Sequence, residues 1–146
     1  MTELLDRRFP ADLSRMGEMR GEIREGMKHE GVPDVLSDNL ILVVDEIVSN
    51  AIEHGVEYRN SDHPIRIQVS KSEEGLVLAV SDVDVPNELI ADLAKEFEQR
   101  DQNVSDSLME RGRGMFLITM LLAELRVSQA DGGGMRLWGR LRESRY

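Results

Sequence analysis

The sequence contains no cysteine among its 146 residues. Disulfide bonds and thiolate chemistry are therefore excluded, and we expect the protein to work in the reducing cytoplasm. The first ten residues, MTELLDRRFP, hold no long apolar stretch, so we expect no secretory signal. No apolar run approaches the roughly 20 residues that a membrane-spanning helix requires. We therefore expect no membrane span.

Positive charge is also scarce. The chain carries 18 Lys and Arg residues against 28 Asp and Glu residues, which gives a formal net charge of −10. This balance argues against binding to nucleic acid or to an anionic membrane surface, because both recruit basic side chains. A nucleotide site would need local cations or a metal ion. The three histidines, at positions 29, 54 and 63, lack metal-ligand spacing, so we expect no zinc site made of protein ligands.

The apolar pattern predicts one domain over residues 1–146 with the element order β, α, α, β, β, α, α, β, β. The segments are a strand over 3–9, helices over 12–30 and 35–54, a hairpin over 63–82, helices over 85–100 and 115–125, and a hairpin over 126–142. A mobile polar loop is expected over 101–114. Because the helices cluster and the strands are mostly antiparallel, we predict an α+β fold, a two-layer sandwich with helices on one face of the sheet.

The ends of the helix over 35–54 have recognisable signals. Asp34 and Ser37 are both candidates for its N-cap. Gly55 follows its last residue and is predicted to occupy the C′ position.

A polar stripe runs along this largely apolar helix. Glu46 and Asn50 lie four residues apart and are therefore neighbours on one face, with Asn39 and Glu53 nearby and His54 at the edge. One interpretation is a solvated face of an amphipathic helix. The other is a cleft, in which carboxylate and carboxamide oxygens suit Mg²⁺ and a carboxylate orients or deprotonates a hydroxyl nucleophile.

A second motif lies before the apolar segment MFLITMLL. Gly112 and Gly114 would let the backbone approach a phosphate closely at the start of a helix, and Arg111 and Arg113 add cations. By itself this pattern is also typical of a flexible turn. It is neither a P-loop nor a dinucleotide-binding fingerprint, because both of those spacings are absent.

Taken in order, these motifs resemble the GHKL (Bergerat-fold) superfamily of ATP-binding domains, and most closely the bacterial anti-sigma factor serine kinases. The N-box of that family, E-x-x-x-N-A-x-x-H, is matched by Glu46, Asn50, Ala51 and His54. Its second glycine box, G-x-G-x-F-L-I, is matched by the segment GRGMFLI over 112–118. The resemblance covers nearly the whole chain.

The resemblance implies a role for each matching position. Asn50 would coordinate the Mg²⁺ that bridges the phosphates of ATP, and Glu46 would act as the general base or orient the attacking hydroxyl. Asp82 would accept a hydrogen bond from the adenine amino group. His54 is expected to be structural.

The phosphate end of the site is implied in the same way. The backbone at Gly112 and Gly114 would hold phosphates, and either Arg111 or Arg113 would reach the γ-phosphate. The segment 87–109 would form the lid over ATP.

Two positions depart from the family pattern. The first glycine box, D-x-G-x-G, is replaced by Asp82-Val83-Asp84-Val85-Pro86, which lacks both glycines. The glycine and threonine that open the last strand in the family are replaced by a segment in which Met135 and Arg136 follow glycine. Both changes concern the pocket for the base.

The resemblance implies a cytoplasmic protein-serine kinase that phosphorylates a STAS-domain anti-anti-sigma protein and sequesters a sigma factor or another client, as a homodimer that contacts neither nucleic acid nor membrane. The alternative is a non-catalytic binding module of the same fold, with little or no nucleotide binding. Glu46 favours the kinase, because a module that only binds has no need for a carboxylate beside Asn50.

Overall fold

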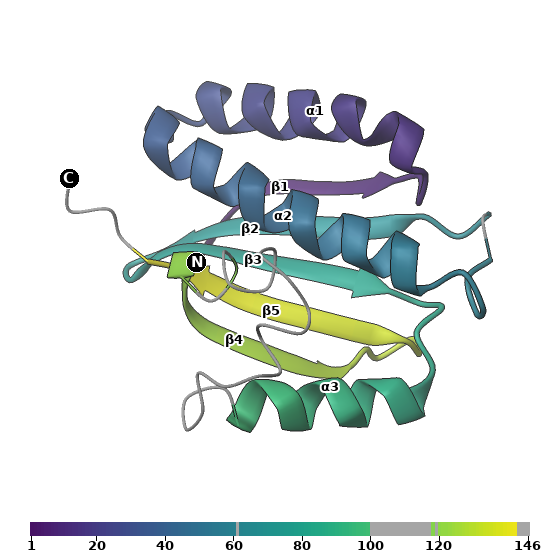
Figure 1. Cartoon of the computed structure of the whole chain (residues 1–146). Helices are drawn as coiled ribbons and strands as arrows, with labels where there is room; N and C mark the ends of the chain where they lie inside the picture. The colour runs from purple at the N-terminus through teal and green to yellow at the C-terminus, as the bar shows by residue number, and fades with distance from the viewer. Residues whose placement is uncertain (61, 100–117, 119, 143–146) are drawn as a thin grey trace.

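The protein is described here from a computed structural model, which covers residues 1–60, 62–99, 118 and 120–142. These residues form a five-stranded sheet in the order β1-β2-β3-β5-β4 (Figure 1). The strands are β1 (Thr2–Phe9), β2 (Ile65–Ser72), β3 (Gly75–Asp82), β4 (Leu122–Gln129) and β5 (Met135–Leu141). Each neighbouring pair is antiparallel.

Two helices cover one face of this sheet. They are α1 (Met16–His29), which follows a short 3₁₀ turn over Leu13–Arg15, and α2 (Asp34–His54). Figure 1 shows α2 crossing the sheet, so that its last turn and the end of β3 lie on the same side of the molecule. The third helix, α3 (Asn87–Gln99), contacts β4. The predicted two-layer α+β fold with an antiparallel sheet is confirmed.

The core lies between the sheet and the first two helices. The alternating residues Ile65, Ile67 and Val69 of β2 point into it and are at most 1% exposed. On α1, buried side chains recur every three to four residues: Met16, Met19, Ile23 and Met27. Burying one side chain of this size contributes about 1.5–3 kcal/mol. This packing holds α2 against the sheet and fixes the direction in which its polar stripe faces.

The predicted helix over 115–125 is wrong at its C-terminal end. β4 begins at Leu122 and pairs with β5 in a register that includes Leu125 opposite Gly139. The segment contains enough leucine to favour a helix locally, but its pairing at the sheet edge satisfies the backbone and decides the outcome. Only Ile118 and residues 120–121 of the predicted helix are described as helical.

Two predictions about where helices begin are also corrected. The helix predicted from residue 12 begins at Met16, because Asp12 caps the 3₁₀ turn instead by accepting a hydrogen bond from the Ser14 N–H. Neither Asp34 nor Ser37 caps α2: Pro33 holds the N-cap position without a side-chain hydrogen bond. Both candidates lie inside the helix.

Gly55 ends α2 without adopting a left-handed conformation, since its φ is −93°. The predicted C′ position is therefore off by one residue, because Gly55 is the C-cap of α2. The reason for glycine is space, because a Cβ at this position would lie 2.4 Å from the carbonyl oxygen of Ala51.

Candidate functional site

The polar stripe of α2 is held at the boundary between core and surface. Glu46 and Asn50 are half-buried, whereas Glu53 and His54 one turn later are exposed. The opposite face carries Val44 and Val48, which are buried against the sheet and so fix the rotation of the helix. In the part of the chain that the structure describes, no side chain hydrogen-bonds to the carboxylate of Glu46 or the amide of Asn50.

Asp82 ends β3 and is 2% exposed. It pairs with Met135 at the start of β5, directly after Gly134. Gly134 has a φ of +81°, and a Cβ there would lie 2.3 Å from the carbonyl oxygen of Asp82. Glycine is required at this position because the turn brings its backbone against that of Asp82. The strand pairing and this glycine together fix where the Asp82 carboxylate lies.

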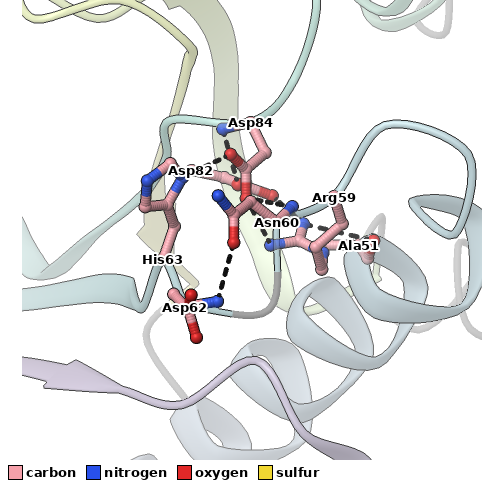
Figure 2. Close-up of polar contacts among 7 residues, drawn as sticks. All are labelled: Ala51, Arg59, Asn60, Asp62, His63, Asp82 and Asp84. Carbon is pink, nitrogen blue, oxygen red and sulfur yellow. Dashed lines mark hydrogen bonds and ion pairs between the residues drawn. The ribbon is translucent and has the colours of Figure 1, made fainter.

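A buried arginine lies against that carboxylate (Figure 2). Arg59 comes from the loop after α2, and its Nη2 donates to Oδ2 of Asp82 and to the carbonyl oxygen of Ala51, the latter at 3.3 Å. Its side chain is 7% exposed. The other oxygen of Asp82, Oδ1, accepts a hydrogen bond of 3.2 Å from the backbone N–H of Asp84. Both oxygens of Asp82 are therefore engaged within the chain.

Asp84 holds the same loop in place. Its carboxylate accepts a 3.1 Å hydrogen bond from the Asn60 N–H, lies 2.7 Å from Nδ1 of His63 and 3.7 Å from Nη1 of Arg59. Figure 2 shows these groups converging from the α2–β2 loop and the end of β3. Asp84 thus fastens the loop at two points on either side of residue 61, while Arg59 fastens it to Asp82.

A small apolar cluster lies beside this ion-pair network. It consists of Val85, Ile90 and Met135, with Tyr58 packed against them. Burial and, next, the negative charge of Asp82 raise the pKa of the Tyr58 phenol. The segment that replaces the expected glycine box therefore contributes packing here, through Val85, which is 4% exposed.

Some of the remaining predicted site residues lie outside the part of the chain that the structure describes. Arg111, Gly112, Arg113 and Gly114 lie outside the described residues, as does the predicted loop over 101–114. Of the predicted lid over 87–109, the first part forms α3 and the rest lies outside the described residues. Ile118, the last residue of the glycine-box motif, is helical and 2% exposed.

A family model described as "Histidine kinase-like ATPase domain" matches residues 9–140. The chain belongs to this family. The match spans every element from the end of β1 to β5, so this ATPase-like domain includes both the polar stripe of α2 and Asp82. No curated protein matches the sequence.

Among solved structures, this ATPase-like domain is similar to a chain in the crystal structure of the SiaB–SiaC complex from Pseudomonas aeruginosa. The two chains share 17% sequence identity with a TM-score of 0.70, and the match covers 94% of this chain and 88% of the other. At this identity the similarity shows the fold, which agrees with the sheet and helices described above.

A domain of this family implies ATP, and typically Mg²⁺, so the residues can be tested for their fit. At the metal end, the fit is good: Glu46 and Asn50 offer half-buried oxygen atoms of the kind Mg²⁺ prefers. No group of three or more His, Asp or Glu side chains converges within the described ranges. An ion here would therefore rely on phosphate oxygens as well. At the base end, the fit is poor while Arg59 is in place, because the Asp82 side chain is 2% exposed and Arg59 lies against its carboxylate.

The sequence motifs did not indicate Arg59. The sequence does contain two charges that could have drawn attention to it: the arginine itself, shortly after the N-box, and Asp84 in place of a family glycine. Only the structure brings these two residues together, 3.7 Å apart, at the carboxylate of Asp82.

Within the described residues, α1, α2 and α3 are each too short or too polar to cross a membrane.

Proposed function

We propose that this domain is an Mg-ATP-dependent protein-serine kinase that phosphorylates a STAS-domain anti-anti-sigma protein and sequesters a sigma factor or another regulatory client. The observation that carries this proposal is the pair Glu46 and Asn50, half-buried neighbours on α2 whose oxygens no described side chain occupies. The SiaB–SiaC assembly supports a search for a protein partner, because a chain of the same fold occurs there in a complex.

In this proposal the chain's own residues have separate tasks. The side-chain oxygen of Asn50 is a ligand of Mg²⁺, and Glu46 accepts the proton of the partner's serine hydroxyl as the serine oxygen bonds to phosphorus. ATP supplies the γ-phosphoryl group, and ADP is the leaving group. Asp82 binds the base, while Arg111 or Arg113 and the backbone of Gly112 and Gly114 bind the phosphates.

Product release follows from charge. A phosphoserine on the partner adds about −1.5 to −2 charges, and this chain has a formal net charge of −10. The phosphorylated partner would therefore be repelled, which is what a partner switch requires. We place the kinase in the cytoplasm as a homodimer that acts through proteins and contacts neither DNA nor membrane.

The test is phosphate transfer from radiolabelled ATP, with Mg²⁺, to a candidate STAS-domain protein. We expect Glu46→Gln to retain nucleotide binding and to lose transfer by about 100-fold or more, because a positioned general base contributes about 10²–10⁴. Asn50→Ala should weaken binding of ATP in Mg²⁺. Glu53→Gln is the matched control, since Glu53 is on the same helix but exposed. Bound ATP without label on any partner would eliminate the kinase.

The second candidate is a non-catalytic binding module. Its specific support is the engagement of both Asp82 oxygens by Arg59 and Asp84. A module of this kind would bind its partner with the same affinity in the presence and absence of Mg-ATP, which a pull-down or calorimetric titration measures.

A further inference from the structure

The base-binding carboxylate is occupied by part of the chain itself. Adenine would bring an N–H donor to Asp82, and Arg59 already brings an N–H donor to Oδ2 of the same residue. A carboxylate oxygen can accept two hydrogen bonds, but the Asp82 side chain is 2% exposed with Arg59 lying against it, so it offers a base almost no open surface. The remaining oxygen is held by the backbone N–H of Asp84. Binding of a base at Asp82 therefore requires Arg59 to move.

The position of Arg59 depends on the neighbouring loop. Gly55 leaves room for the arginine side chain, because a Cβ there would lie 3.1 Å from Nε of Arg59. The backbone N–H of Arg59 also donates to the carbonyl oxygen of Gly55 at 2.8 Å, which closes the turn after α2. The Arg59 guanidinium therefore reaches Asp82 from a tight turn that directly follows the end of α2.

Asp84 explains why the family glycine is absent. In its place, the carboxylate binds the loop through the Asn60 N–H and His63 and lies 3.7 Å from Nη1 of Arg59. A glycine at position 84 would provide none of these contacts. The aspartate and the arginine thus work as a pair: one fixes the loop, and the other covers the base-binding carboxylate.

We propose that Arg59 is an internal competitor for Asp82, held in place by Asp84, and that it sets the affinity of this domain for nucleotide. The proposal rests on the function proposed above, which assigns base binding to Asp82. The closed form has the ion pair, and the open form, with Arg59 displaced, binds the base. The apparent dissociation constant equals that of the open form divided by the fraction of molecules that are open.

Two features set the balance between the closed and the open form: burial of the ion pair favours the closed form, and unsatisfied donors on Arg59 favour the open form. Arg59 and Asp82 are 7% and 2% exposed at their side chains, so separating them leaves buried charges without partners unless a ligand or water replaces the contact. Two nitrogens of Arg59, Nε and Nη1, are buried without a hydrogen-bond partner among the described residues. These unsatisfied donors lower the cost of moving the side chain, because they gain water when it leaves. Arg59 is thus a residue that can be displaced.

The experiment is a titration of each protein with a fluorescent ATP analogue and Mg²⁺. We expect Arg59→Ala to bind at least about tenfold more tightly than the wild type, since an open fraction of a tenth or less gives this factor. Asp84→Gly, which restores the family glycine and keeps Arg59, should give an intermediate gain. Arg15→Ala is the control, because Arg15 forms an exposed ion pair with Glu18 far along the chain from this site.

Thermal unfolding of the same variants separates competition from a merely structural role. Arg59→Ala should melt at a lower temperature than the wild type without ligand, and Mg-ATP should raise its melting temperature by more than it raises that of the wild type. A purely structural arginine would lower stability and leave the ligand-induced shift unchanged or smaller. If Arg59→Ala is too unstable to assay, Asp84→Gly carries the same test.

The outcomes distinguish this proposal from the kinase. Equal or weaker binding by both variants overturns the competition by Arg59 and leaves the kinase standing. Tighter binding by the variants without transfer to any partner overturns the kinase and leaves the competition standing. No binding by any of the proteins overturns both.

Discussion

The turn between β4 and β5 offers a graded test of the geometry around Asp82. It contains three consecutive glycines, Gly132, Gly133 and Gly134. A Cβ added at Gly132 would have no atom within 4 Å, and the φ of Gly132 is not positive. Gly133 has open space but a φ of +93°, and Gly134 has both a φ of +81° and a backbone atom of Asp82 2.3 Å from the added Cβ. Alanine at these positions therefore isolates one cause at a time.

The expected costs follow in the same order. Gly132→Ala should change the free energy of unfolding by less than about 1 kcal/mol and can stabilise, because alanine restricts the unfolded chain. Gly133→Ala should cost about 1–2 kcal/mol for a left-handed residue with a Cβ. Gly134→Ala adds displacement of the Asp82 and Val83 backbone, so we expect about 3 kcal/mol or more in total.

These values convert to measurable shifts. At about 2–4 °C per kcal/mol for a chain of this size, Gly134→Ala should melt roughly 6–12 °C below the wild type. Circular dichroism during heating, without nucleotide, measures all three variants under one condition. If Gly134→Ala and Gly132→Ala have the same melting temperature, the close approach of this turn to Asp82 is refuted, and with it the position of the carboxylate. If Gly133→Ala and Gly134→Ala are equally destabilised, only the backbone conformation matters.

Two further predictions concern stability away from the site. Ile23→Ala, at a core position with 0% exposure, should lower the free energy of unfolding by about 2–5 kcal/mol in urea titrations, whereas Val35→Ala, 52% exposed, should change it by no more than about 0.5 kcal/mol. The hydrogen bond from Arg66 lowers the pKa of Asp6, so this carboxylate stabilises the fold above its unfolded pKa and loses that contribution as pH falls through the lowered value. Asp6→Asn should therefore be less stable than the wild type near neutral pH, and the difference should vanish in strong acid; a constant difference would contradict the assignment.

Most of the fold follows from periodicity. The three-to-four spacing of Met16, Met19 and Ile23 predicted α1, and the alternation in Ile65, Ile67 and Val69 predicted β2, because these patterns report which side of an element is buried. The prediction failed where one apolar segment is compatible with both a helix and a strand. Leu122 is compatible with a helix or a strand, and pairing with β5 selected the strand.

Part of the candidate site was predictable for a similar reason. Glu46 and Asn50 are four residues apart on one helix, so their proximity follows from helical geometry without knowledge of the rest of the chain. The structure added their half-buried position. The roles of both residues remain predictions, as does base binding by Asp82.

The amino-acid sequence by itself determined the family pattern, the polar stripe on α2 and the loss of both glycines after Asp82, because these are local features of short segments. Only the tertiary structure decided what the residues that replace these glycines contact. Arg59 and Asp82 are 23 residues apart in the chain. They meet because α2, which lies over the sheet, and β3, which lies in it, end at the same end of the molecule. No local pattern encodes such a contact, since it depends on how the helix packs across the strands. The same packing places Asp84 where it can hold the loop that carries Arg59.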